Sequence, residues 1–266
     1  MSGGSVRRPA RRLTASGADP VEETVAEEVA VALVYNGISH AVMMATPCDL
    51  EDFGRGFSLT ERIVEGAGEI YDVEVEPVAQ GVEVRLDIAA QRMASLRERR
   101  RTLAGRTGCG LCGVDSIAAA MRPVAVQGNG TAVSRAAIGR AMAALPAAQE
   151  INRANGAMHA AGWARPDGTL VAVREDVGRH NALDKLCGAV LGRPLDAPLA
   201  GFVVVTSRCS YEMVHKAAAM GAAVIAAVSA PTSLAIEVAE QSGIALAAFV
   251  RDGRLTVYAH PERVVP

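Results

Sequence analysis

One pair of cysteines offers the most reactive chemistry in this sequence. Cys109 and Cys112 lie in the segment Arg106-Thr107-Gly108-Cys109-Gly110-Leu111-Cys112-Gly113, which holds the only C-x-x-C of the chain. The flanking glycines leave little side-chain bulk, so a partner can approach both sulfurs closely. Arg106 and an arginine-rich stretch before it favour the thiolate, which is the reactive form. Two such thiols can bind a metal, cycle as a disulfide, or carry sulfur as a persulfide.

A metal site would need two further ligands at suitable spacing. The chain has no second C-x-x-C, Cys187 and Cys209 stand alone, and the histidines lack zinc-ribbon spacing. The H-x-E and P-C-x-x-C of zinc deaminases are also absent. We therefore predict no permanently bound metal. A thioredoxin-like redox pair would stand between a strand and a helix of a βαβ unit, whereas this pair follows a basic helical stretch, so a redox role is disfavoured. The glycine-rich setting also makes a pair of inert loop cysteines less favoured than a functional pair.

Polar residues also follow the predicted strands of the C-terminal half. The segment Arg174–Lys185 joins a strand to a helix, where an anion or nucleotide could bind at the helix N-terminus. Helix capping by Asp176 and a solvated face carrying Asp184 explain the segment equally well. The segments 206–216 and 229–233 each place small polar residues after an apolar strand. Ligands of α/β sheets bind at such strand ends, so the two together favour a pocket rim.

The hairpin Phe249-Val250-Arg251-Asp252-Gly253-Arg254 carries two arginines on one tight turn. Such a hairpin is usually just a charged turn. Arginine can also bind phosphate through two parallel hydrogen bonds, so a phosphate-bearing ligand is the alternative.

The elements that must position these residues fall into two groups. Residues 28–44 and 70–88 alternate as two hairpins, with a helix from about 49 to 64 between them and the basic helix 89–103 after them. Later, a hairpin at 159–174 is followed by apolar strands near 202–206, 223–228 and 245–250. These strands alternate with helices at 179–191, 211–220 and 232–241, which predicts βαβ units around a parallel or mixed sheet. A helix at 134–145 precedes this part.

We therefore predict four regions. Residues 1–18 form a disordered basic tail, 19–104 an N-terminal β-rich part with the basic helix, 105–133 a mobile cysteine loop, and 134–266 an α/β cofactor-binding part.

Composition limits the class of protein. The chain has 266 residues, half of them apolar, which suffices for a substantial core. Five cysteines at irregular spacing do not make a secreted disulfide framework, so a reducing cytoplasm fits better. The net charge of −2 argues against coating nucleic acid, and the apolar runs are too short to span a bilayer. We expect a soluble cytoplasmic protein with no nucleic-acid or membrane partner.

Taken together, these segments resemble the FdhD family, the sulfur carriers required for formate dehydrogenase activity. The matching stretches are GRTGCGLCG, REDVGRHNALDK, TSRCSYEMVHKAAAMG, SAPTSLA and FVRDGRLTVYAHPER. They run in order from about residue 105 to the C-terminus, and the N-terminal hairpins are more weakly similar.

The resemblance implies a cytidine-deaminase-like mixed-sheet α/β layer with an added N-terminal β-rich part. It implies a sulfurtransferase that carries sulfur from a cysteine desulfurase to the molybdenum bis(molybdopterin guanine dinucleotide) cofactor, its bound substrate, on behalf of formate dehydrogenase. Cys109 would carry the persulfide with Cys112 assisting, and Phe249, Val250, Arg251, Asp252, Gly253 and Arg254 would bind the cofactor. A second copy of the chain is the other expected partner, in a homodimer.

Two points stay open at the level of sequence. A non-catalytic chaperone that binds the cofactor and docks the dehydrogenase would carry the same cofactor segment. Cys209 lies where a small residue is expected beside the pocket, so it could be a third participating thiol, although a buried free cysteine is more common.

Overall fold

A six-stranded mixed sheet forms the centre of the C-terminal half in a computed structural model that describes residues 3–103, 131–192 and 200–266. Its strand order is β13-β12-β11-β10-β8-β9, and β10, β11 and β12 run parallel while the other neighbours are antiparallel. The strands are β8 (His159–Ala164), β9 (Leu170–Asp176), β10 (Phe202–Val205), β11 (Val224–Ala227), β12 (Ala245–Arg251) and β13 (Arg254–Ala259). This confirms a mixed α/β fold, whereas the finer cytidine-deaminase-like assignment stays a prediction.

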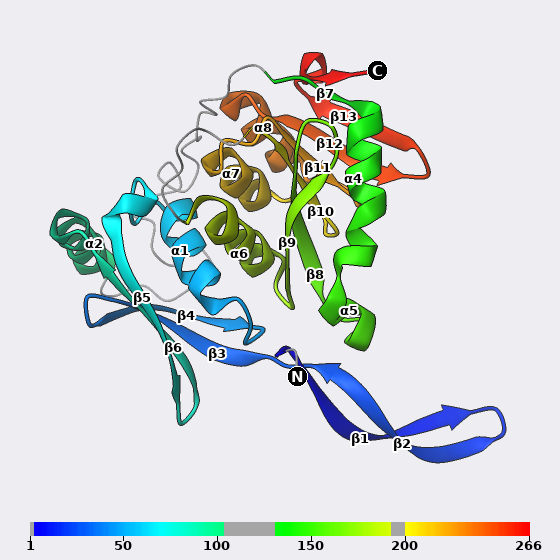
Figure 1. The fold of residues 1–266 in the computed structure, drawn as a ribbon, viewed down its shortest axis with the longest axis horizontal. Coiled ribbons are helices and arrows are strands. Elements are labelled where there is room, and N and C mark those ends of the chain that lie inside the picture. Colours follow the sequence, from blue (N-terminus) through cyan, green and yellow to red (C-terminus); the bar gives the residue numbers. More distant parts are fainter. Residues whose placement is uncertain (1–2, 104–130, 193–199) are drawn as a thin grey trace.

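Helices cover both faces of this sheet (Figure 1). On one face lie α6 (Arg179–Leu191), α7 (Tyr211–Ala219) and α8 (Ser233–Ser242), and on the other lies α4 (Arg135–Ala148), followed by the short α5 (Glu150–Asn155). Strand residues alternate between the two cores: Val203 and Val205 pack toward α6 and α7, Phe202 and Val204 toward α4. Burial on both faces explains why β10 and β11 are continuous apolar runs.

The N-terminal half builds a second, four-stranded sheet in the order β4-β3-β6-β5. Its strands are β3 (Val29–Tyr35), β4 (Ile38–Ala45), β5 (Ile70–Val78) and β6 (Gly81–Ile88), and one face packs against α1 (Leu50–Thr60) and α2 (Ala90–Leu103). Asn36 and Gly37, both at positive φ, make the turn between β3 and β4. The two hairpins and the basic helix predicted from the sequence are therefore present.

The two halves meet where α1 crosses α6 at very short range. A Cβ atom on Gly56 would lie 1.7 Å from the carbonyl oxygen of Asp184, and one on Gly188 would lie 1.9 Å from that of Asp52. Only glycine permits backbones this close. We call this crossing the helix joint.

The N-terminal segment differs from its prediction as a disordered tail over residues 1–18. Strands β1 (Ser5–Thr14) and β2 (Gly17–Ala26) pair along their full length as a two-stranded ribbon that extends away from both sheets (Figure 1). The pairing sets arginines of β1 against acidic residues of β2; for example, the Arg12 guanidinium lies 2.6 Å from Glu23 Oε1. The positive charge of residues 1–18 suggested disorder, but acidic residues between 19 and 23 balance it. The prediction had assigned those acidic residues to another region.

Most of the predicted cysteine loop, 105–133, lies outside the described residues. Its last residues are described, since β7 (Val133–Ser134) pairs with β14 (Val264–Val265) near the C-terminus. Within the three described ranges, no helix is both long and apolar enough to cross a membrane.

Candidate functional site

The predicted cofactor segment forms the turn between β12 and β13. Asp252 and Gly253 occupy its centre with φ of 51° and 71°, the left-handed pair of a tight hairpin turn. Phe249 also has positive φ, 53°, where the β12–β13 register shifts, and its backbone N–H donates to Ser229 at 3.4 Å. An aromatic residue in this conformation costs energy, and such strain clusters at functional sites.

A cavity of about 530 Å³ opens beside this turn. It is lined by Arg135, Phe249, Arg251, Gly253, Arg254, Leu255 and Thr256. Three arginines line it, and none of the lining residues within the described ranges is a carboxylate, so it favours anions such as phosphate groups. The partly exposed ring of Phe249 adds an apolar surface on which a flat base could stack. We call this the arginine cavity.

The predicted cofactor residues divide into two sets. Phe249, Arg251, Gly253 and Arg254 line the arginine cavity, whereas Val250 is buried in the core beneath α4 and Asp252 stands exposed at the tip of the turn. Strand alternation separates Val250 from Phe249 and Arg251, because successive side chains leave β12 on opposite sides, whereas Asp252 lies in the turn beyond the strand. The binding role of these six residues stays a prediction.

Sequence reasoning missed the third arginine of the cavity. Arg135 is the first residue of α4, and its Nη1 donates to the Gly253 carbonyl at 2.8 Å. A cation at a helix N-terminus interacts unfavourably with the helix dipole, so an arginine at this position is a sequence signal for a role outside the helix. Arg135 precedes the hairpin by more than a hundred positions, so the sequence alone does not indicate that the two lie together.

The strand ends predicted as a pocket rim do lie together at the carboxyl edge of the parallel strands, since the backbone N–H of Cys209 donates to Ala230 at 3.1 Å and that of Thr232 donates to Cys209 at 3.0 Å. Beside them, His180 in the first turn of α6 places Nε2 2.8 Å from Oε2 of Glu212 in the first turn of α7. This close contact with His180 lowers the pKa of Glu212. At the start of β8, burial, together with the positive charges of Arg179 and His180, lowers the pKa of His159.

Other charged residues of the segment 174–185 form ion pairs and hydrogen bonds in the protein interior. Asp176 and Lys185 are fully buried and form an ion pair of 2.7 Å, and Asp176 also accepts hydrogen bonds from the backbone of Thr46 and Gly178. Asp184 accepts from Thr60 at 2.6 Å and pairs with Lys216 at 2.8 Å. These contacts bind the α/β half to the N-terminal half and leave these carboxylates unavailable to a ligand.

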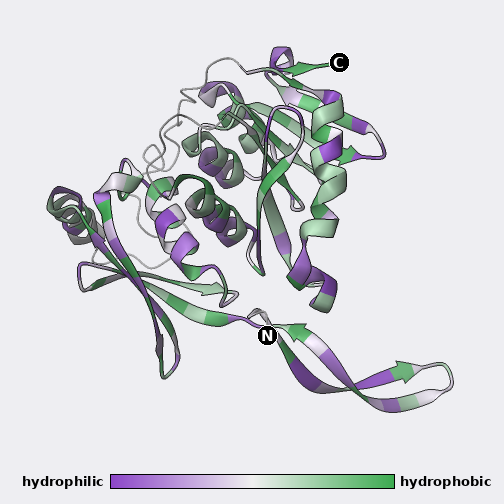
Figure 2. Cartoon of the chain, viewed as in Figure 1, coloured by the Kyte–Doolittle hydropathy of each residue, from purple (hydrophilic) through white to green (hydrophobic). Residues whose placement is uncertain are grey.

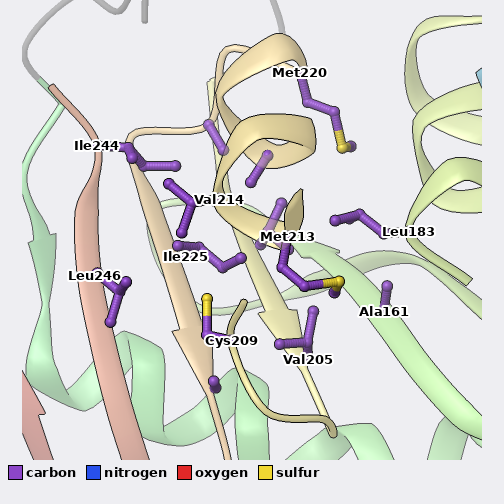
Figure 3. Close-up of a cluster of buried hydrophobic side chains, with 14 of the residues drawn as sticks. Ala161, Leu183, Val205, Cys209, Met213, Val214, Met220, Ile225, Ile244 and Leu246 are labelled. Atoms are coloured by element: carbon purple, nitrogen blue, oxygen red, sulfur yellow. The ribbon is translucent and has the colours of Figure 1, made fainter. Parts of the chain in front are cut away.

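The predicted catalytic residues Cys109 and Cys112 lie outside the described residues. Of the other cysteines, Cys187 and Cys209 are buried, and Cys48 is partly buried 3.8 Å from the Lys185 ammonium. Burial raises the pKa of Cys48 to about 11 and that of Cys209 to about 12. Figure 3 shows Cys209 among Val205, Ile225 and Leu246. Its surroundings are those of a core residue.

In the ranges 3–103, 131–192 and 200–266, no group of three or more histidine, cysteine or acidic side chains is arranged to hold a metal ion. The cysteine pair lies outside these ranges, so the absence of a bound metal stays a prediction.

Comparison with known proteins gives a consistent result over nearly the whole chain. A sequence model of the FdhD/NarQ family matches residues 26–265, beginning at the last residue of β2. The sulfur carrier protein FdhD of Cupriavidus necator is 55% identical over 242 residues, covering 91% of this chain and 84% of its own. The protein of the same name from Bordetella petrii is 49% identical over 248 residues, covering 93% and 89%.

The fold is also similar to a solved structure. A crystal structure from Desulfotalea psychrophila, described as a formate dehydrogenase accessory protein, superposes with a TM-score of 0.75 at 25% identity. The superposition covers 98% of this chain and all of that one.

Proposed function

Because this chain belongs to the FdhD/NarQ family, we propose that it is a sulfur carrier serving formate dehydrogenase. In this proposal it accepts sulfur from a cysteine desulfurase and passes it to the molybdenum bis(molybdopterin guanine dinucleotide) cofactor, its substrate. The observation that carries the proposal is the arginine cavity, because a cationic pocket with an aromatic wall suits the phosphates and the base of a dinucleotide. The protein would act in the cytoplasm as a homodimer.

The sulfur step uses the C-x-x-C pair. The Cys109 thiolate attacks the outer sulfur of the donor's persulfide, so that one S–S bond forms, the donor's S–S bond breaks, and the donor cysteine leaves as a thiolate. The Cys112 thiolate then attacks the inner sulfur of the Cys109 persulfide. This second step forms a Cys109–Cys112 disulfide and releases the outer sulfur, reduced to hydrosulfide, for the cofactor. Arginines near the pair favour the thiolates that both steps require.

The nucleotide end of the cofactor is proposed to bind in the arginine cavity. Arg135, Arg251 and Arg254 would pair with phosphate oxygens, and Arg135 is already oriented by the Gly253 carbonyl. A positioned guanidinium loses less rotational freedom on binding than a free one. Phe249 would stack on the guanine ring.

A double variant, Cys109→Ala/Cys112→Ala, tests the proposal. Incubated with a desulfurase and cysteine, the wild type should gain the mass of one sulfur atom and the variant none, because the acceptor thiols are gone. The variant should still bind GDP, a stand-in for the cofactor's nucleotide end, with unchanged affinity in calorimetry, since none of the described residues that line the cavity is a cysteine.

The outcomes separate the sulfur carrier from the chaperone alternative. Activation of formate dehydrogenase by the double variant would support a chaperone and refute sulfur transfer. Loss of GDP binding in a folded double variant would mean that the cysteine segment forms part of the nucleotide site. Sulfur gain by Cys109→Ser alone would remove Cys109 as the persulfide carrier.

A further inference from the structure

The outer face of the four-stranded sheet is strongly acidic. Its inner face is buried against α1 and α2, so the alternate residues of β5 and β6 point to solvent. They comprise five carboxylates and one guanidinium: Asp72, Glu74, Glu76, Glu83, Asp87 and Arg85. We call this surface the acidic face.

Like charges oppose one another on the acidic face. Asp72 is paired with Asp87, and Glu76 with Glu83, across the antiparallel β5–β6 ladder. Carboxylates directly opposite each other destabilise a sheet. Arg85 bridges Glu76 and Glu83, leaving four uncompensated negative charges on the face as a whole. A cationic occupant would remove this repulsion.

An apolar strip continues from the acidic face toward the sheet edge. In one row across the sheet, Glu83 neighbours Ala32 of β3, which neighbours Val42 of β4. The side chains of Val42 and Met44 are 62% and 52% exposed. The outer surface therefore suits a partner that offers arginines beside apolar side chains.

The β1–β2 ribbon offers this combination. Strand β1 carries Arg7, Arg8, Arg11 and Arg12, and it ends in Leu13, which is 75% exposed. Figure 2 shows the ribbon with both hydrophilic and hydrophobic stretches along its length. Because β1 alternates without a register shift, Arg7, Arg11 and Leu13 share one face of the ribbon, and Arg8 and Arg12 lie on the other. In the described part of the chain, Arg11 has no carboxylate within ion-pair distance, and Arg7 has only the exposed Glu22 at 3.5 Å. Both faces of the ribbon are mostly exposed.

The two strands of the ribbon need a further packing partner for stability, because they form a sheet of only two strands. A two-stranded hairpin is at best marginally stable alone in water. Its base is held to α5 by a 2.9 Å hydrogen bond from Asn155 to Ser5, and from there it extends away from both sheets (Figure 1). Pro9 and Pro20 lack backbone donors and so disfavour the addition of further strands at its edges. Docking through a ribbon face is therefore favoured.

We propose that the β1–β2 ribbon of one copy docks on the acidic face of a second copy, and that the second ribbon docks reciprocally. Arg7 and Arg11 would meet the carboxylates of β5 and β6, and Leu13, on the same ribbon face, would meet the strip of Val42 and Met44. Twofold symmetry makes each contact twice, which lets a narrow ribbon approach the ~1,200 Å² that stable interfaces bury. The inference rests on the homodimer of the proposed function but not on sulfur transfer.

A charge-exchange experiment tests the contact with the full chain. The sheet variant Asp72→Lys/Glu74→Lys/Glu83→Lys makes the acidic face net positive, turns both opposed carboxylate pairs into pairs of opposite charge, and keeps the bridge from Arg85 to Glu76. It should therefore stay folded. The ribbon variant is Arg7→Glu/Arg11→Glu, which leaves that ribbon face, with Glu22, carrying only acidic charges. In sedimentation velocity we expect a wild-type dimer and, for each variant alone, a dimer dissociation constant raised at least ~100-fold, because like charges then face each other.

Mixing the two variants should restore dimers in a one-to-one ratio. In the mixed dimer one ribbon–sheet contact is native and the other has both charges exchanged, so both are complementary. A matched control, Glu237→Lys/Glu240→Lys on α8, should dimerise like the wild type.

The charge changes in the ribbon variant could act by unfolding the ribbon. A variant that lacks residues 5–26 removes the ribbon altogether, and we expect this deletion variant to be a monomer. A deletion variant that remains dimeric, either charge variant that remains dimeric, or a mixture that stays monomeric would overturn this contact while leaving the homodimer standing. A monomeric wild type would refute both the homodimer and the contact, and neither outcome bears on sulfur transfer.

Discussion

The helix joint and the arginine cavity use the same residue types in opposite ways. Beside the joint, Lys216 and Asp184 are buried and Glu61 is half exposed, and each charge has a partner within 3 Å. At the cavity, three arginines stand among the lining residues, and none of the lining residues that the structure describes is a carboxylate. The first arrangement is complete without a ligand, whereas the second needs an anion to complete it.

This contrast shows why charged motifs are ambiguous in a sequence. The segment 174–185 contains more charges than the hairpin 249–254, yet most of them are satisfied internally. The hairpin has fewer charges, but its arginines remain available. Availability, and not charge density, separates a binding residue from a structural one.

Breaking the joint should give the largest effect. Lys216→Met leaves Asp184 buried without its cation, which typically costs about 3–5 kcal/mol of unfolding free energy. Urea denaturation measures this, with Glu237→Ala on the exposed face of α8 as the control. The double variant Lys216→Met/Asp184→Leu should recover much of the loss, because the charge that then lacks Lys216, that of Glu61, is half exposed to water. Additive losses in this cycle would show that the pair is not coupled.

Changes at the arginine cavity should affect binding and spare stability. Arg135→Ala, Arg251→Ala and Arg254→Ala should each weaken GDP binding about tenfold or more, since a charged hydrogen bond contributes about 1.5–3 kcal/mol. Their unfolding free energies should stay within about 0.5 kcal/mol of the wild type, as is usual for exposed positions. Calorimetry and denaturation on the same samples test both halves. Unchanged affinity would move the nucleotide site to the strand ends around His180.

Thiol reactivity should likewise differ between the cysteines of the C-x-x-C pair and the buried cysteines. With a pKa of about 11, Cys48 is about 0.1% thiolate at pH 8, whereas an ordinary cysteine is about a quarter thiolate. Alkylation of the native protein should therefore fall on Cys109 and Cys112, with Cys48 and Cys209 modified only after unfolding. Peptide mass mapping identifies the labelled sites. Rapid native labelling of Cys209 would reopen its role as a third sulfur-handling thiol.

The smallest effect is expected at the carboxyl edge, where His180 meets Glu212. The 2.8 Å contact with His180 lowers the pKa of Glu212 in the folded protein relative to its ordinary value of 4.5. A lowered folded pKa contributes stability above pH ~4.5 that is lost as the pH falls through the folded value. Glu212→Gln should therefore flatten the fall in stability below pH ~4.5, as thermal melts across pH 3–6 would show. An unchanged acid profile would contradict the assignment.

Local patterning was enough to predict most elements of the fold. The alternation at 28–44 and 70–88 and the apolar runs at 202–206 and 223–228 are short-range signals, and each appears as predicted. The β1–β2 ribbon was missed because its stability depends on a pairing between arginines and acids that composition alone does not reveal. The two-residue β7 was missed because its partner β14 lies at the other end of the chain.

The candidate site was predicted where neighbours in sequence are neighbours in space. Arg251 and Arg254 share one turn, so their joint role could be inferred. Arg135 reaches them only through the fold, and the same holds for the pairs that join Asp184 to Thr60 and Arg174 to Asp52. No local rule specifies contacts across more than a hundred residues.

The glycine contact at the helix joint also has a consequence for synthesis on the ribosome. Gly56 and Gly188 must touch backbone on the opposing helix, but they are separated by about half of the chain. At ~5–20 residues per second, α6 is made roughly 7–26 s after α1. Throughout that interval the nascent N-terminal half presents a flat, glycine-lined helix surface with nothing to cover it. The length of this delay, and not the local stability of the hairpins, would set how long the newborn chain depends on cellular protection from aggregation.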